Sequence, residues 1–137
     1  MKFLEAIFAE IQWFFQRGKD GVADSDVWNF DYYLAKVICK GLRKLKKISH
    51  TTPPNLTYKE WNEVLDKITY TFETYQKVID LDYVYPLEDE KYEELLKYWE
   101  NFNKEYRDNV HVMTNEELKK YEEGFDLFRK HFYDLWD

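Results

Sequence analysis

The chain has 137 residues, of which 20% are aromatic and 34% are charged, and its formal net charge is −7. This length suits one domain with a core of its own, and the low glycine and proline content excludes a disordered or loop-rich protein. The single cysteine, Cys39, excludes an internal disulfide and any multi-cysteine metal site.

Residues 1–17 predict a first helix with a broad apolar stripe, which we expect to pack in the core. The stripe consists of Phe3, Leu4, Ile7, Phe8, Ile11, Phe14 and Phe15. Gly18 is placed to end this helix, and Trp13 lies off the stripe, where we expect it to be exposed. Glu5 and Glu10 interrupt the apolar residues, so we expect no signal peptide. Too few basic residues accompany the stripe to favour a membrane surface.

The residues that follow predict a central helix spanning residues 25–48. Asp24 and Ser25 are favourable N-cap residues, Asp26 adds negative charge to the first turn, and Gly21 supplies the preceding turn. The apolar residues form two adjacent faces, which indicates packing on two sides. One face holds Val27, Phe30, Leu34, Ile38, Leu45 and Ile48, and the other holds Trp28, Tyr32, Ala35, Cys39 and Leu42.

Asp31 interrupts this pattern, because helical spacing places it inside the apolar arc. A buried carboxylate needs a hydrogen bond or an ion-pair partner. Asp31 is therefore interpreted either as a structural acid bonded to a tryptophan or tyrosine, or as an acid with a raised pKa in a pocket. The remaining side of the helix is basic and is either solvated or faces nucleic acid or an acidic partner. Its residues are Lys36, Lys40, Arg43, Lys44 and Lys47.

Three further helices are expected after the connector that contains Pro53 and Pro54. The first begins with the capping box Thr57–Glu60 and runs to about residue 82, the second spans 88–107, and the third begins with the capping box Thr114–Glu117. Tyr70 and Tyr98 lie on polar sides of these helices. Gly124 is expected to permit close packing, and no strand pattern competes with the helical one. The sequence predicts an all-α, compact single domain, 1–137, with five helices and an acidic C-terminal pair over 88–137.

Motifs for catalysis are absent from the sequence: it contains no phosphate-binding glycine loop, zinc-protease helix or serine-hydrolase elbow. The three histidines, His50, His111 and His131, are scattered, with His131 on a polar helix face, and no Glu-x-x-His pattern occurs. We therefore expect no metal, no cofactor and no catalytic residue. Residues 56–137 carry a net charge of −10, which argues against a nucleic-acid partner.

Residues 17–75 carry a more specific pattern. It comprises Gly21-x-x-Asp24-x-Asp26-Val27-Trp28-Asn29-x-Asp31, then Leu34-Ala35, Leu42-x-x-Leu45-Lys46, and Leu56-Thr57-x-x-x-Trp61-x-x-x-Leu65-Asp66 with Phe72. This pattern resembles a family of small uncharacterised proteins encoded by tailed bacteriophages and prophages. The resemblance implies a bacterial host cytoplasm but transfers no activity and no catalytic residue.

Two functions remain as hypotheses. The first is a phage accessory protein that binds a host or phage protein, for example to counter a defence system. Its candidate contact residues are Trp13, Tyr70, Tyr98, Lys36, Lys40, Arg43 and Lys47. The second is a small-ligand binder or enzyme with a pocket formed by Asp24, Trp28, Asp31, His50 and Trp61. The oligomeric state does not follow from the sequence.

Overall fold

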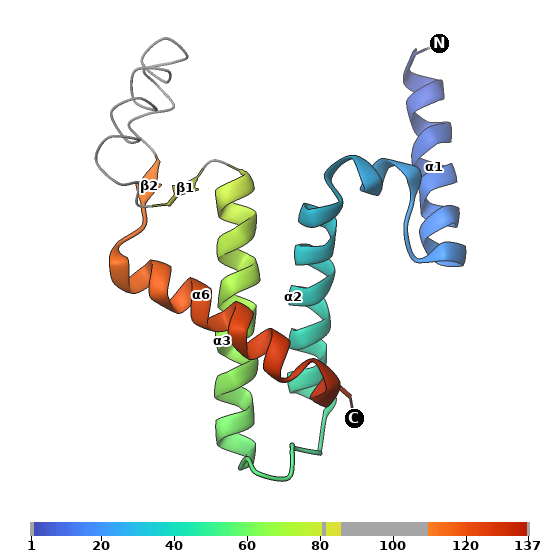
Figure 1. Cartoon of the computed structure of the whole chain (residues 1–137). Helices are drawn as coiled ribbons and strands as arrows, with labels where there is room; N and C mark the ends of the chain where they lie inside the picture. The colour runs from blue at the N-terminus through green and yellow to red at the C-terminus, as the bar shows by residue number, and fades with distance from the viewer. Residues whose placement is uncertain (1, 81, 86–109, 137) are drawn as a thin grey trace. The chain divides into compact units, whose positions relative to one another are not determined.

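The computed structural model describes residues 2–80, 82–85 and 110–136, and these residues form an all-α fold (Figure 1). Its four α-helices are α1 (Lys2–Asp20), α2 (Phe30–Ile48), α3 (Tyr58–Ile79) and α6 (Asn115–Lys130). Two short 3-10 helices, η1 (Asp24–Asn29) and η2 (Phe132–Asp134), accompany them. The predicted fold class is confirmed, while the helix predicted over 88–107 lies outside the described residues.

A short parallel strand pair was not predicted. Strand β1 (Tyr83–Val84) pairs with β2 (His111–Val112), with Tyr83 opposite His111. Each strand has only two residues, which is too short for the period-two pattern of a strand to show in the sequence.

The chain divides into two units, Met1–Leu34 and Ala35–Asp137, and each is described by itself. Unit 1 contains α1, η1 and the first residues of α2, and unit 2 contains the rest of α2 together with α3, the strand pair, α6 and η2. That the whole chain forms one domain stays a prediction.

In unit 1 the central helix begins later than predicted. Residues Asp24–Asn29 form a 3-10 helix, and the α-helix starts at Phe30. Helix α1 also passes the predicted stop at Gly18 and ends at Asp20, where Gly21 turns the chain with a φ of 77°. Glycine suits that left-handed conformation because it has no Cβ to clash with the backbone.

The core lies in unit 2, between one face of α2 and one face of α3. It contains Ala35, Cys39 and Leu42 of α2 and Trp61, Leu65, Ile68 and Phe72 of α3. Of the two apolar faces predicted for the central helix, one is buried at Ala35, Cys39 and Leu42 but leaves Trp28 exposed. On the other face Ile38 and Leu45 are half-buried, whereas Val27, Phe30, Leu34 and Ile48 are exposed. Within their own units those four residues are uncovered, so packing on a second side stays a prediction there.

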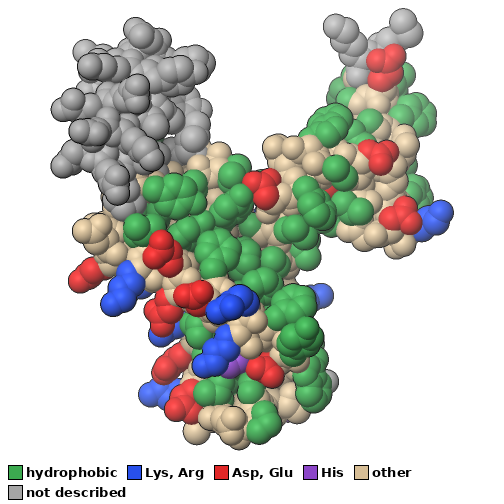
Figure 2. Space-filling model, in the orientation of Figure 1, with side chains coloured by type: hydrophobic (Ala, Val, Ile, Leu, Met, Phe, Trp, Pro, Cys, Tyr) green, Lys and Arg blue, Asp and Glu red, His purple; other side chains and the backbone are tan. Residues whose placement is uncertain are grey.

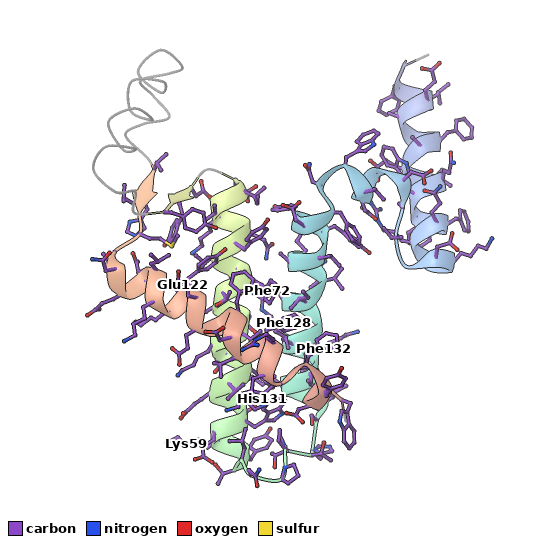
Figure 3. All side chains as sticks on the ribbon, in the orientation of Figure 1. Lys59, Phe72, Glu122, Phe128, His131 and Phe132 are labelled. Atoms are coloured by element: carbon purple, nitrogen blue, oxygen red, sulfur yellow. The ribbon has the colours of Figure 1, made fainter. Side chains whose placement is uncertain are left out.

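Helix α6 crosses α3 and closes the core (Figures 1 and 3). The Phe72 ring of α3 meets the rings of Phe125 and Phe128 edge-on, with centroids 5.3 and 5.0 Å apart. Gly124 of α6 allows this approach, since a Cβ built there would lie 1.7 Å from Thr71 Oγ1. The expectation of close packing at Gly124 is confirmed.

Both predicted capping boxes are confirmed. The Glu60 carboxylate accepts a hydrogen bond from Thr57 N–H at 2.8 Å, and the Glu117 carboxylate accepts one from Thr114 N–H at 2.8 Å. Each threonine hydroxyl in turn accepts from the amide of its glutamate. Two of the orphan amides at the start of each of α3 and α6 are thus satisfied within four residues of sequence.

Candidate functional site

The most unusual surface of the described residues lies on α1. Seven large apolar side chains on one side of this helix, here called the α1 face, are exposed to solvent, and hydrophobic side chains are prominent over α1 in Figure 2. The seven are Phe3, Leu4, Ile7, Phe8, Ile11, Phe14 and Phe15. The four phenylalanines have exposed fractions of 68–77%. The predicted stripe therefore exists, and unit 1 by itself leaves it uncovered, while its expected packing in the core stays a prediction.

Unit 1 contains almost no core of its own. Among its described residues only Ala23 is buried, at 1% exposure. Segments below about 40 residues rarely bury enough apolar surface to fold without a metal, disulfides or association with another surface. The α1 face is therefore a surface that gains stability when something covers it.

Polar contacts hold η1 against the C-terminal end of α1. Arg17 donates two hydrogen bonds to the Asp26 carboxylate, at 2.8 Å from Nε and 2.5 Å from Nη2. Gln16 donates to Asp24 at 2.7 Å and accepts from the Asp24 amide at 3.1 Å. The hydrogen bonds that Arg17 donates to Asp26 raise the pKa of the Arg17 guanidinium. Asp24 and Asp26 thus orient the turn after α1.

The apolar surface of unit 1 continues along η1 and into α2. Trp28 is 79% exposed, and Val27 and Phe30 are exposed as well. The Tyr33 hydroxyl, near the start of α2, donates a hydrogen bond to the Gly21 carbonyl in the turn after α1, at 2.6 Å. The turn is therefore fixed by polar contacts while its large apolar side chains remain uncovered.

The residues of the predicted pocket are distributed over both units. Asp24, Trp28 and Asp31 belong to unit 1, and His50 and Trp61 belong to unit 2. Asp31 is exposed, so its predicted burial in the apolar arc is wrong. Because the helix begins at Phe30, Asp31 lies in the first turn of α2, where a carboxylate is favoured by the helix dipole. The pocket itself stays a prediction.

Trp61 has a partner that the sequence did not indicate. Its ring meets the ring of His131 edge-on, with centroids 5.5 Å apart, and His131 Nδ1 lies 2.8 Å from Asp134 Oδ2. His131 is buried at 8% exposure, so its predicted place on a polar helix face is wrong. In the sequence, only the three-residue spacing of His131 and Asp134 points to the contact between those two residues, and the same spacing also occurs on solvated helix surfaces.

A small cleft of about 150 Å³ is lined by Asp134, Trp136 and residues 51–54. None of the five predicted pocket residues lines it.

The predicted interaction residues have mixed outcomes. Trp13 and Tyr70 are half-buried, so the expectation that Trp13 is exposed is wrong, and Tyr98 lies outside the described residues. Arg43 forms an ion pair with Glu73 of α3, and Lys46 next to it on α2 pairs with Asp66 at 2.6 Å. Lys36, Lys40 and Lys47 are exposed. Part of the basic side of α2 therefore joins α2 to α3.

Among residues 2–80, 82–85 and 110–136, no group of three or more histidine, cysteine or acidic side chains is arranged to hold a metal ion. Across the same residues, no helix combines the length and the apolar character needed to cross a bilayer. Cys39 is buried, in keeping with its predicted place on an apolar helix face, and burial raises the pKa of its thiol.

Comparisons with protein-family models, with curated proteins and with solved structures gave no match. The resemblance to small phage proteins over residues 17–75 therefore stays a prediction.

Proposed function

We propose that the protein acts by binding another protein, and that the α1 face is the binding surface. The observation that supports this is the exposure of seven large apolar side chains on one side of a 19-residue helix. Contiguous exposed apolar patches larger than a few hundred Å² mark interaction sites on monomeric proteins. An amphipathic helix that places apolar side chains at helical spacing into a groove is a recurring mode of protein recognition.

The setting we propose is that of a phage accessory protein acting on a host or phage protein in the bacterial cytoplasm, for example one that counters a host defence. This part rests on the resemblance of residues 17–75 to small phage proteins. The aromatic content of the surface adds support, because phenylalanine, tryptophan and tyrosine supply much of the contact area and energy of protein interfaces.

The test is a comparative capture experiment from infected bacterial cells. Tagged wild-type protein, Phe8→Asp and Gln12→Asp each serve as bait, and the captured proteins are compared by quantitative mass spectrometry. Gln12 is exposed and lies outside the α1 face, so its variant introduces the same carboxylate away from the proposed surface. We expect a partner that is retained by wild type and Gln12→Asp and lost by Phe8→Asp. Recovery of the same proteins by all three baits would overturn the proposal.

A further inference from the structure

We infer that, when no other partner is bound, the α1 face of one chain pairs with the α1 face of a second copy. This inference rests on the proposed function, because it names the occupant of the same α1 face. It can fail while that function stands, because a monomeric protein could still bind a different partner through α1.

The spacing of the α1 face is the first argument for helix pairing. Leu4, Ile7, Ile11 and Phe14 follow one another at intervals of three or four residues, which is the a/d pattern of two consecutive heptads. Gly18 occupies the next a position, so the seam ends within α1. Such a seam lets two identical helices interlock by inserting side chains of one between those of the other.

The residues beside the seam widen it. Phe8 and Phe15 fall at e positions and Phe3 falls at a g position, and all three are exposed. A face that includes a, d and e positions is typical of helices that pack in a bundle. The exposed apolar area of the α1 face is on the order of 700 Å², given the area that aromatic and aliphatic side chains bury. Stable interfaces bury about 800 Å² on each partner, so two α1 faces approach the area that a dimer needs.

The charge of α1 is the third argument. The helix carries three basic residues, Lys2, Arg17 and Lys19, and three acidic ones, Glu5, Glu10 and Asp20, whereas the whole chain carries −7. Two copies can therefore bring their α1 helices together without local net repulsion. An anionic membrane or a strongly charged partner would be selected by a helix whose polar face has a net charge of the opposite sign, and the three basic and three acidic residues of α1 cancel. Because one patch serves both copies, the predicted pair is a two-fold symmetric dimer.

Sedimentation velocity of the full chain over a wide range of protein concentrations tests the inference. We expect wild type to show a reversible monomer–dimer equilibrium. Ile11→Asp should weaken it at least about a hundredfold, because the two-fold axis places two buried carboxylates in each dimer. Gln12→Asp, which adds the same charge at an exposed position off the face, should leave the equilibrium within about threefold of wild type.

A crosslinking measurement keeps the test independent of whether Ile11→Asp folds. In a Cys39→Ala background, Ile7→Cys should give dimers with a short bis-maleimide reagent, and Gln12→Cys should give none. A protein that remains monomeric at all concentrations, or that crosslinks equally from both positions, overturns the inference. Co-sedimentation of the monomer with phosphatidylcholine–phosphatidylglycerol vesicles that Ile11→Asp abolishes would assign the face to a lipid surface and would also overturn it.

Discussion

At the scale of single residues, Gly124 marks the closest approach of α6 to α3. A Cβ at this position would lie 1.7 Å from Thr71 Oγ1 and 2.7 Å from the Lys67 carbonyl oxygen. Thr71 is fully buried, and its hydroxyl donates to the Tyr121 carbonyl at 2.9 Å. An added methyl group would therefore push the helices apart and leave a buried hydroxyl without its acceptor.

We predict that Gly124→Ala lowers the free energy of unfolding by about 1–3 kcal/mol, because overpacking outweighs the better helix propensity of alanine. Gly41→Ala on α2 is the matched control, since nothing lies within 4 Å of a Cβ there. The free energy of unfolding of Gly41→Ala should rise by about 0.5–1 kcal/mol. Urea unfolding followed by circular dichroism measures both changes, and equal signs for the two variants would contradict the packing at Gly124.

The stability that the N-terminal cap of α3 contributes is expected to depend on pH. The hydrogen bond from the Thr57 amide, with a second from the Thr57 hydroxyl, lowers the pKa of Glu60 below its usual value of 4.5. A carboxylate with a lowered folded-state pKa contributes stability that is present above the unfolded pKa and is lost as pH falls through the folded pKa.

Glu60→Gln keeps an acceptor oxygen for Thr57 but cannot titrate. We therefore expect wild type to be more stable than Glu60→Gln at neutral pH, with the difference closing as pH falls below the folded-state pKa of Glu60. Glu63→Gln removes the same charge from an exposed position of α3 that does not cap the helix. The difference in stability between Glu63→Gln and wild type should change less over the same pH range. Melting temperatures of the three proteins measured across that range check both expectations. A gap for Glu60→Gln that persists in acid would show that the charge does not provide the effect.

At the scale of elements, the sequence predicted helices well where the deciding contacts are local. The boxes Thr57–Glu60 and Thr114–Glu117 set the starts of α3 and α6 through hydrogen bonds within four residues, and both starts were predicted. The start of α2 was not predicted. The Asp24 carboxylate, a predicted N-cap group, binds Gln16 of α1. The Asp26 carboxylate binds Arg17 of α1 and also accepts a hydrogen bond from the Ala23 amide at 2.8 Å, which caps η1. Contacts with α1 and a cap on η1 therefore engage the carboxylates that were expected in the cap and first turn of the α-helix.

The α1 face shows a different limit of periodicity. Apolar residues at helical spacing predict an amphipathic helix, and α1 is one. The same pattern does not state which surface covers the apolar side, because a core, a second copy and a partner all require the same residue types. The exposure of Phe8 and Phe14 in unit 1 could therefore not be derived from their spacing. His131 is a comparable case, since only the fold brings Trp61 to it.

At the scale of the whole molecule, the two units differ in how they are stabilised. Unit 2 has a core of seven buried residues contributed by α2 and α3. The described part of unit 1 buries one alanine and is held by hydrogen bonds between α1 and η1. Unit 2 therefore has a buried apolar core, and the described part of unit 1 has almost none.

The same substitution in the two units tests this division. Ile68→Ala removes a side chain with 0% exposure from the core of unit 2 and should cost about 2–5 kcal/mol of unfolding free energy. Ile11→Ala removes a 47% exposed side chain from the α1 face, so at low protein concentration it should cost well under 1 kcal/mol. Urea unfolding at several protein concentrations measures both values.

The dependence on concentration separates the two sources of stability. The cost of Ile68→Ala arises inside one chain and should not change with protein concentration. The cost of Ile11→Ala should grow as concentration rises, because association through the α1 face stabilises the folded chain by mass action. A large, concentration-independent cost for Ile11→Ala would mean that α1 is covered within its own chain, and would contradict both the proposed binding surface and its pairing with a second copy.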